Sequence, residues 1–218
     1  MSLDGYEVAQ RMGLEAFLDI QGDDGTALFL EDGRILKLTG SPSEPALAIA
    51  LRDLQIAGRS HPSVPWIHDV RWFDDEVDVS QIMPKIGTMP LRRYAIVRDD
   101  FHEFETEEEI WDNETWRAAL ADLAFGWSRN SMMHIERARE RWAPRGTEID
   151  DILDGLRWIE ANTGVRVNDV RHSNLGVSPK GRVGMRDLGR GSFPDAILDL
   201  VWRPDIETLP KRALTPAP

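Results

Sequence analysis

The chain has no cysteine among its 218 residues, which excludes a disulfide framework, thiol catalysis and a cysteine-ligated zinc site. It has no apolar run approaching the ~20 residues of a membrane-spanning helix. The first ten residues, MSLDGYEVAQ, show no signal-peptide pattern. Since a reducing compartment fits these absences, we expect a cytoplasmic protein that does not bind a membrane.

Positive charge is scarce. The chain has 26 lysines and arginines against 38 aspartates and glutamates, a formal net charge of −12 at pH 7. Such a surface repels the phosphates of nucleic acids, so we expect no nucleic-acid partner, whereas a cationic partner or substrate is easier to accommodate. Hydrophobic residues make up 41% of the chain and include 8 tryptophans, enough for one domain or two small lobes with a real core.

The most informative stretch covers residues 164–200 and carries Asp169, Asn174 and Asp187. Alternating apolar residues around a turn at 179–181 predict two short strands, whose ends would present two carboxylates and an amide to one cleft. Phosphoryl transfer uses such a set: one carboxylate orients the attacking hydroxyl, while the amide and the second carboxylate hold magnesium. Any one of these residues alone would be explained more simply as a solvated turn residue.

The spacing gives the patterns D-x4-N and D-L-G-R, and two more aspartates follow at positions 195 and 199. On these residues the segment resembles the catalytic and magnesium-binding loops of the protein-kinase-like superfamily, and it is especially similar to the aminoglycoside and choline kinase branch. One feature departs from that pattern, because Val167 and Asn168 stand where relatives have a histidine that supports the loop. We expect the absence of this histidine to affect the rate of phosphoryl transfer more than the binding of nucleotide.

The resemblance implies an α+β fold in two lobes, with ATP and Mg²⁺ as cofactors. A small antiparallel-sheet lobe over residues 1–86 would bind the nucleotide, and a mainly helical, shortened lobe over residues 87–218 would hold the catalytic groups. Apolar periodicity predicts helices over residues 116–127 and 149–159 of that second part. The implied roles are hydroxyl orientation for Asp169, a fixed charge at the γ-phosphoryl group for Arg171, and metal binding for Asn174 and Asp187.

A lysine within an apolar strand is the main feature of the N-terminal part. Residues 26–38 alternate around a turn at 31–34 and predict a hairpin whose second strand contains Lys37. An edge-strand lysine facing water is the ordinary explanation. In the resembled family, however, the third strand carries the lysine that binds the α- and β-phosphates, and this favours the same role here. Gly22 and Gly25 precede the hairpin at the spacing of a phosphate-binding loop, although G-x-x-G alone is more often only a turn.

Residues 43–58 predict a helix, with Ser43 as a candidate N-cap. In the resembled family this helix supplies a glutamate that holds the lysine. Glu44 is the only glutamate in the segment but lies at the mouth of the helix, where it would also complement the helix dipole. Asp53 is the internal alternative, and the sequence supports the two about equally.

The connector between the lobes has two candidate positions. Strand-like residues 77–86 follow an acidic turn at 74–76 and end in a segment that resembles the kinase connector. Backbone groups around Met83 and Lys85 would there pair with the edge of adenine. Residues 98–101, which follow another strand-like run, are the alternative.

Together these patterns predict an ATP- and Mg²⁺-dependent kinase that transfers the γ-phosphoryl group to a hydroxyl. A protein serine or threonine is the favoured acceptor, because residues 61–70 resemble the helix-to-strand passage of protein kinases. A cationic small molecule is the alternative, because residues 99–114 contain nine carboxylates and no basic residue other than histidine, and no A-P-E signature follows the motif. A pseudokinase that binds nucleotide and acts as an interaction module is a further hypothesis, motivated by the missing histidine.

Overall fold

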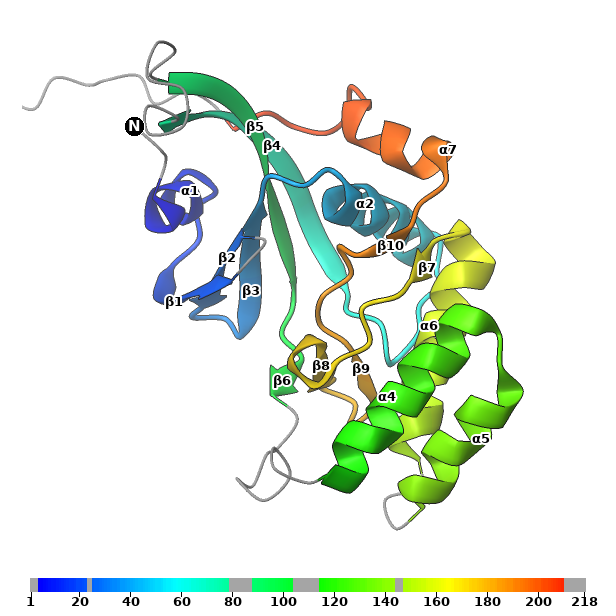
Figure 1. Cartoon of the computed structure of the whole chain (residues 1–218). Coiled ribbons are helices and arrows are strands. Elements are labelled where there is room, and N and C mark those ends of the chain that lie inside the picture. The colour runs from blue at the N-terminus through cyan, green and yellow to red at the C-terminus, as the bar shows by residue number, and fades with distance from the viewer. Residues whose placement is uncertain (1–3, 23–24, 79–87, 104–113, 144–146, 210–218) are drawn as a thin grey trace, which may run out of the picture.

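The computed structural model describes residues 4–22, 25–78, 88–103, 114–143 and 147–209. The fold is mixed α+β, with a five-stranded antiparallel sheet in the order β1-β2-β3-β5-β4 (Figure 1). The strands of this sheet are β1 (Ala16–Gly22), β2 (Gly25–Leu30), β3 (Arg34–Thr39), β4 (Ile67–Asp78) and β5 (Thr88–Asp99).

Helices cover both faces of the sheet and form most of the rest of the molecule. They are α1 (Gly5–Arg11), α2 (Ser43–Ile56), α4 (Glu114–Arg129), α5 (Met132–Arg141), α6 (Glu148–Thr163) and α7 (Asp195–Leu198), with the 3-10 turns η1 (His172–Asn174) and η2 (Asp199–Trp202). Short strands complete the fold: β6 (His102–Glu103), β7 (Arg166–Val167), β8 (Leu175–Val177), β9 (Val183–Met185) and β10 (Gly191–Ser192). Of the helices in the described ranges, none is long and apolar enough to cross a membrane.

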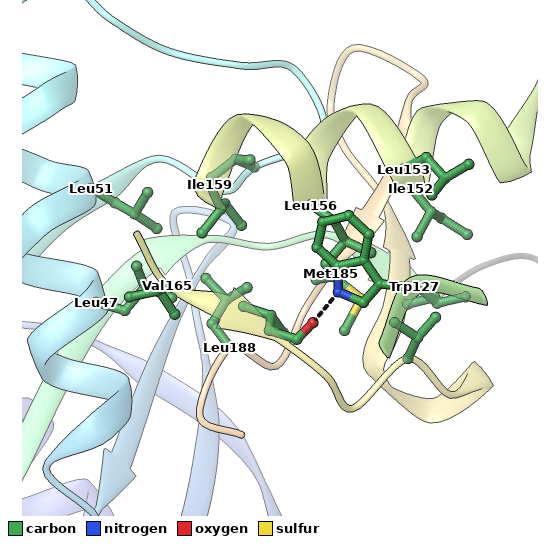
Figure 2. Packing of buried hydrophobic residues seen from close by; sticks show 14 of the residues in the cluster. Leu47, Leu51, Trp127, Ile152, Leu153, Leu156, Ile159, Val165, Met185 and Leu188 are labelled. Atoms are coloured by element: carbon green, nitrogen blue, oxygen red, sulfur yellow. Dashed lines mark hydrogen bonds between the residues drawn. The ribbon is translucent and has the colours of Figure 1, made fainter. Parts of the chain in front are cut away.

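The alternation of the strands builds two separate apolar clusters. Leu36 and Leu38 of β3 face α1, whereas Tyr94 and Ile96 of β5 face α2. The cluster on the α2 side is the larger and continues into α4, α5, α6 and the short strands. Figure 2 shows part of it, with side chains of α2 and α6 converging on the segments around Val165 and Met185. The helices predicted over residues 116–127 and 149–159 are confirmed as parts of α4 and α6.

The predicted acidic turn at residues 74–76 is wrong, because these residues lie inside β4. Asp75 is buried and its Oδ2 accepts a hydrogen bond of 3.0 Å from Nη1 of Arg93 on β5. The guanidinium of Arg93 on the neighbouring strand therefore stabilises residues 74–76 in an extended conformation. By local preference alone, three consecutive acidic residues would favour a solvated turn.

The main sheet extends to Asp99, since β5 pairs on both sides, with β3 and with β4. The boundary between the two lobes that is expected after residue 86 consequently falls in the connection between β4 and β5. It does not fall where the chain leaves the sheet. The chain leaves the sheet through residues 100–101 and enters β6, which pairs with β8. Residues 98–101, the alternative connector, therefore lie at this passage, whereas Met83 and Lys85 lie outside the described residues.

The β8–β9 hairpin is held against the loop between α2 and β4. A Cβ atom added to Gly184 of β9 would lie 2.0 Å from the carbonyl oxygen of Ser63 and 2.9 Å from the ring of Phe101. Because the nearest obstacle is backbone, it cannot turn aside as a flexible side chain would. Gly184 therefore sets how closely β9, which leads directly to Asp187, approaches the loop at Ser63.

We expect Gly184→Ala to lower the free energy of unfolding by about 2 kcal/mol or more, since the added methyl group must displace backbone. Gly40→Ala is the matched control, because its Cβ would meet only the side chain of Leu91 at an ordinary 3.6 Å. Urea unfolding of both variants measures the difference. Equal stability of the two variants would contradict the close approach of β9 and Ser63.

Candidate functional site

Lys37 lies between two carboxylates from distant parts of the chain. Its Nζ is 2.8 Å from Oε2 of Glu44 and 3.0 Å from Oδ2 of Asp187. Strand β3 has neighbours on both sides, and Lys37 is only 8% exposed. The explanation as a water-facing edge lysine is therefore wrong, and the ammonium group is buried with two counter-ions.

The first turn of α2 supplies the helix carboxylate of this cluster. Glu44 is buried there, because α2 packs on the face of the sheet that carries Lys37. Asp53, the alternative partner, lies about two and a half turns further along α2 and accepts a hydrogen bond from Arg203 instead. The structure thus pairs Lys37 with Glu44 and not with Asp53.

The two carboxylates of the cluster have opposite pKa shifts. Burial raises the pKa of Glu44 above its ordinary value of 4.5, although the nearby Lys37 opposes this. Burial acts in the same direction on Asp187, but Lys37 and the N–H of Gly189, which donates to Oδ1 over 3.0 Å, outweigh it and lower the pKa of Asp187. Asp187 is therefore the more strongly anionic of the two and is the better candidate for a cation ligand.

Arg98 of β5 is a buried cation that the sequence reasoning missed. It is opposite Ile35 of β3 and is 6% exposed. Burial lowers the pKa of its guanidinium, and the charges of Glu44 and Asp187 counteract that effect. The sequence contains a signal for it, because Arg98 directly follows the apolar run of residues 94–97.

The loop around Asp169 forms a second group of charges. Nδ2 of Asn174 donates both to the backbone oxygen of Asp169, over 3.0 Å, and to its Oδ2, over 2.9 Å. Nε of Arg171 is 3.3 Å from the same carboxylate oxygen, and Nε of Arg190 is 3.9 Å from it. The structure thus brings Asp169, Arg171 and Asn174 together and adds Arg190, which belongs to the D-L-G-R pattern but was given no role.

The β8–β9 hairpin places Asn174 beside Asp187. Leu175 pairs with Met185, and the N–H of Arg186 donates to the backbone oxygen of Asn174 over 2.6 Å. The amide nitrogen of Asn174 is directed at Asp169, so its side-chain oxygen is the atom able to bind a cation. Mg²⁺ prefers such oxygen donors.

The site offers few side chains that could bind a metal ion. Within the described ranges, no group of three or more histidine, aspartate or glutamate side chains could hold a metal ion. Mg²⁺ commonly binds through one or two protein oxygens together with substrate phosphates and water. Asn174 and Asp187 could supply two oxygen ligands to an ion of this kind.

Gly22 and Gly25 pair with each other at the turn end of the β1–β2 hairpin. Gly25 has a φ of 155°, and a Cβ there would lie 1.9 Å from the carbonyl oxygen of Leu38. The close approach of β2 to β3 thus requires a glycine at position 25 whatever the hairpin binds. Phosphate binding by these two glycines stays a prediction.

Comparisons with protein-family models and with curated proteins give no match to this chain. The functional assignment therefore depends on the residues of the site and their geometry.

We expect Lys37→Met to lower the free energy of unfolding at pH 7 by about 3 kcal/mol, because it leaves two carboxylates without their shared cation. Without Lys37 the folded-state pKa of Glu44 lies still further above its ordinary 4.5, so the folded variant binds more protons than the unfolded one above that pH. The stability of the variant should consequently rise, relative to wild type, as the pH falls from 7 towards 5.

Lys180→Met is the control for this measurement, because Lys180 is exposed in the β8–β9 turn. Chemical unfolding at several pH values compares the three proteins. A pH-independent loss in Lys37→Met, or an equal loss in Lys180→Met, would contradict the buried ion cluster.

Proposed function

We propose that the chain is an ATP- and Mg²⁺-dependent phosphotransferase with a two-lobed, protein-kinase-like arrangement, which transfers the γ-phosphoryl group to a hydroxyl. The observation that carries the proposal is the 3.0 Å bond between Lys37 and Asp187, which joins the main sheet to the loop after β9 across 150 positions of sequence. The sheet with α2 would be the nucleotide-binding lobe. The part with α4, α5 and α6 would be the catalytic lobe.

The roles follow from the charges of the site. Lys37 would bind phosphate oxygens, since two carboxylates orient its ammonium group and its third N–H can donate to a further anion. Asn174 and Asp187 would hold Mg²⁺, which neutralises phosphate charge when bound. Asp169 would orient the acceptor hydroxyl and accept its proton, and Arg171 would attract the transferred phosphoryl group.

The acceptor is the least determined part of the proposal. A protein serine or threonine is favoured by residues 61–70, which form the passage from α2 into β4. A cationic small molecule is favoured by the acidic residues 99–114, most of which lie outside the described ranges. Both classes of acceptor therefore belong in the assay.

A nucleotide-binding module without turnover is the second candidate. Val167 provides no histidine side chain before Asp169. A module of this kind would bind Mg-ATP but transfer no phosphoryl group.

We expect Asp169→Asn to reduce transfer by about 100-fold or more while ATP binding is kept, because its carboxylate would face the acceptor. Asp187→Asn should instead weaken the binding of ATP that depends on magnesium. Asp154→Asn, which changes an exposed carboxylate of α6, is the control and should change neither property.

Transfer of labelled γ-phosphate to the protein itself, to a generic protein substrate and to aminoglycoside or choline measures the first effect. The shift in melting temperature with ATP, with and without Mg²⁺, measures the second. If the wild-type protein binds ATP but transfers no phosphoryl group, the second candidate is supported. If the Mg²⁺-dependent shift in melting temperature is the same in wild type and Asp187→Asn, the assignment of Asp187 as a metal ligand is wrong.

A further inference from the structure

Two buried tryptophans of α4 hydrogen-bond to the two ends of the loop that carries Asp169. Nε1 of Trp127 donates to the backbone oxygen of Val167 over 2.6 Å, as the dashed line in Figure 2 shows. Nε1 of Trp116 donates to Nδ1 of His172 over 2.8 Å. Asp169 lies between these two points of attachment.

The tryptophans themselves are firmly held. Trp116 is 0% and Trp127 4% exposed. The ring of Trp116 packs against Trp142 with centroids 4.4 Å apart, and the guanidinium of Arg166 lies 4.3 Å from the ring centre of Trp127. Neither indole can turn without disturbing the core, so the directions of their N–H groups are fixed.

The acceptors of the two indole N–H groups lie in the same loop. A buried indole N–H requires a partner, and many backbone carbonyls can serve. Here both tryptophans of one helix use atoms of one short loop, one on each side of Asp169. The first acceptor is the backbone of Val167, the residue whose side chain can offer no polar support to the loop.

We propose that Trp116 and Trp127 are positioning residues, which hold the loop over residues 167–172 at both ends and so fix the direction of the Asp169 carboxylate. This inference rests on the proposed phosphotransferase function. The tryptophans act through the loop, since the acceptor atoms are Val167 O and His172 Nδ1, and the loop then presents Asp169.

Trp116→Phe and Trp127→Phe remove the donors and keep an aromatic ring in the core. Each should raise the rate of amide hydrogen exchange in residues 167–174 about tenfold, the equivalent of one lost hydrogen bond. Each should also lower kcat for phosphoryl transfer about tenfold while KM for ATP stays within about twofold, because the nucleotide contacts are untouched.

Trp158→Phe is the control, because Trp158 of α6 packs against the same apolar cluster and its ring lies beside that of His61. It should change neither loop exchange nor kcat. Loop exchange that rises equally in all three variants indicates general loosening of the core and overturns the proposal. Loop exchange that rises in none of them overturns it as well.

Variants of His172 test the same contact from the loop side. The Oδ1 of His172→Asn can accept the hydrogen bond in place of Nδ1, whereas His172→Leu has no acceptor. His172→Leu should therefore reproduce the effects of Trp116→Phe, His172→Asn should retain most of the wild-type kcat, and combining Trp116→Phe with His172→Leu should add no further loss.

The exchange measurement separates this proposal from the proposed function. If the wild-type protein transfers no phosphoryl group, the phosphotransferase function is wrong, and loop exchange alone decides whether the tryptophans hold the loop. If exchange rises while kcat is unchanged in an active enzyme, the tryptophans are structural and the positioning role is wrong.

Discussion

The burial of one ammonium group is the constraint on which the rest of the structure depends. A lysine removed from water costs several kcal/mol unless anions and hydrogen bonds compensate. Lys37 obtains two carboxylates, Glu44 from the first turn of α2 and Asp187 from the loop after β9. The main sheet, α2 and the loop after β9 must therefore be folded together. The ion pairs of Lys37 join segments that the apolar cluster brings near each other.

The apolar framework determines the distances within the site. Helix α2 packs on the sheet, α6 packs on β9, and Gly184 permits β9 to approach the backbone at Ser63. The tryptophans of α4 then fix the loop around Asp169 from the other side. Asp169 and Asp187 lie on short loops, and each loop is joined to a strand close to that residue.

The local charge of the site differs from that of the whole chain. The net charge is −12, yet Lys37 and Arg98 lie at one carboxylate cluster, and Arg171 and Arg190 lie at another. A set of cations beside oxygen ligands is what a magnesium-bound phosphate chain requires, because its charge is negative even after the metal is bound.

The sequence alone determined the features that depend on short spacing. The periodicity of α4 and α6, the β8–β9 hairpin and the grouping of Asp169 with Asn174 were all predictable, because neighbouring residues fix them. The tertiary structure alone decided which distant groups meet: Glu44 and not Asp53 at Lys37, Arg93 opposite Asp75, Arg98 in the cluster, and tryptophans of α4 on the loop. These contacts depend on strand register and on the packing of helices against the sheet. Local preference carries no information about either, so an acidic triplet whose middle residue is buried beside Arg93 was predicted to be a turn.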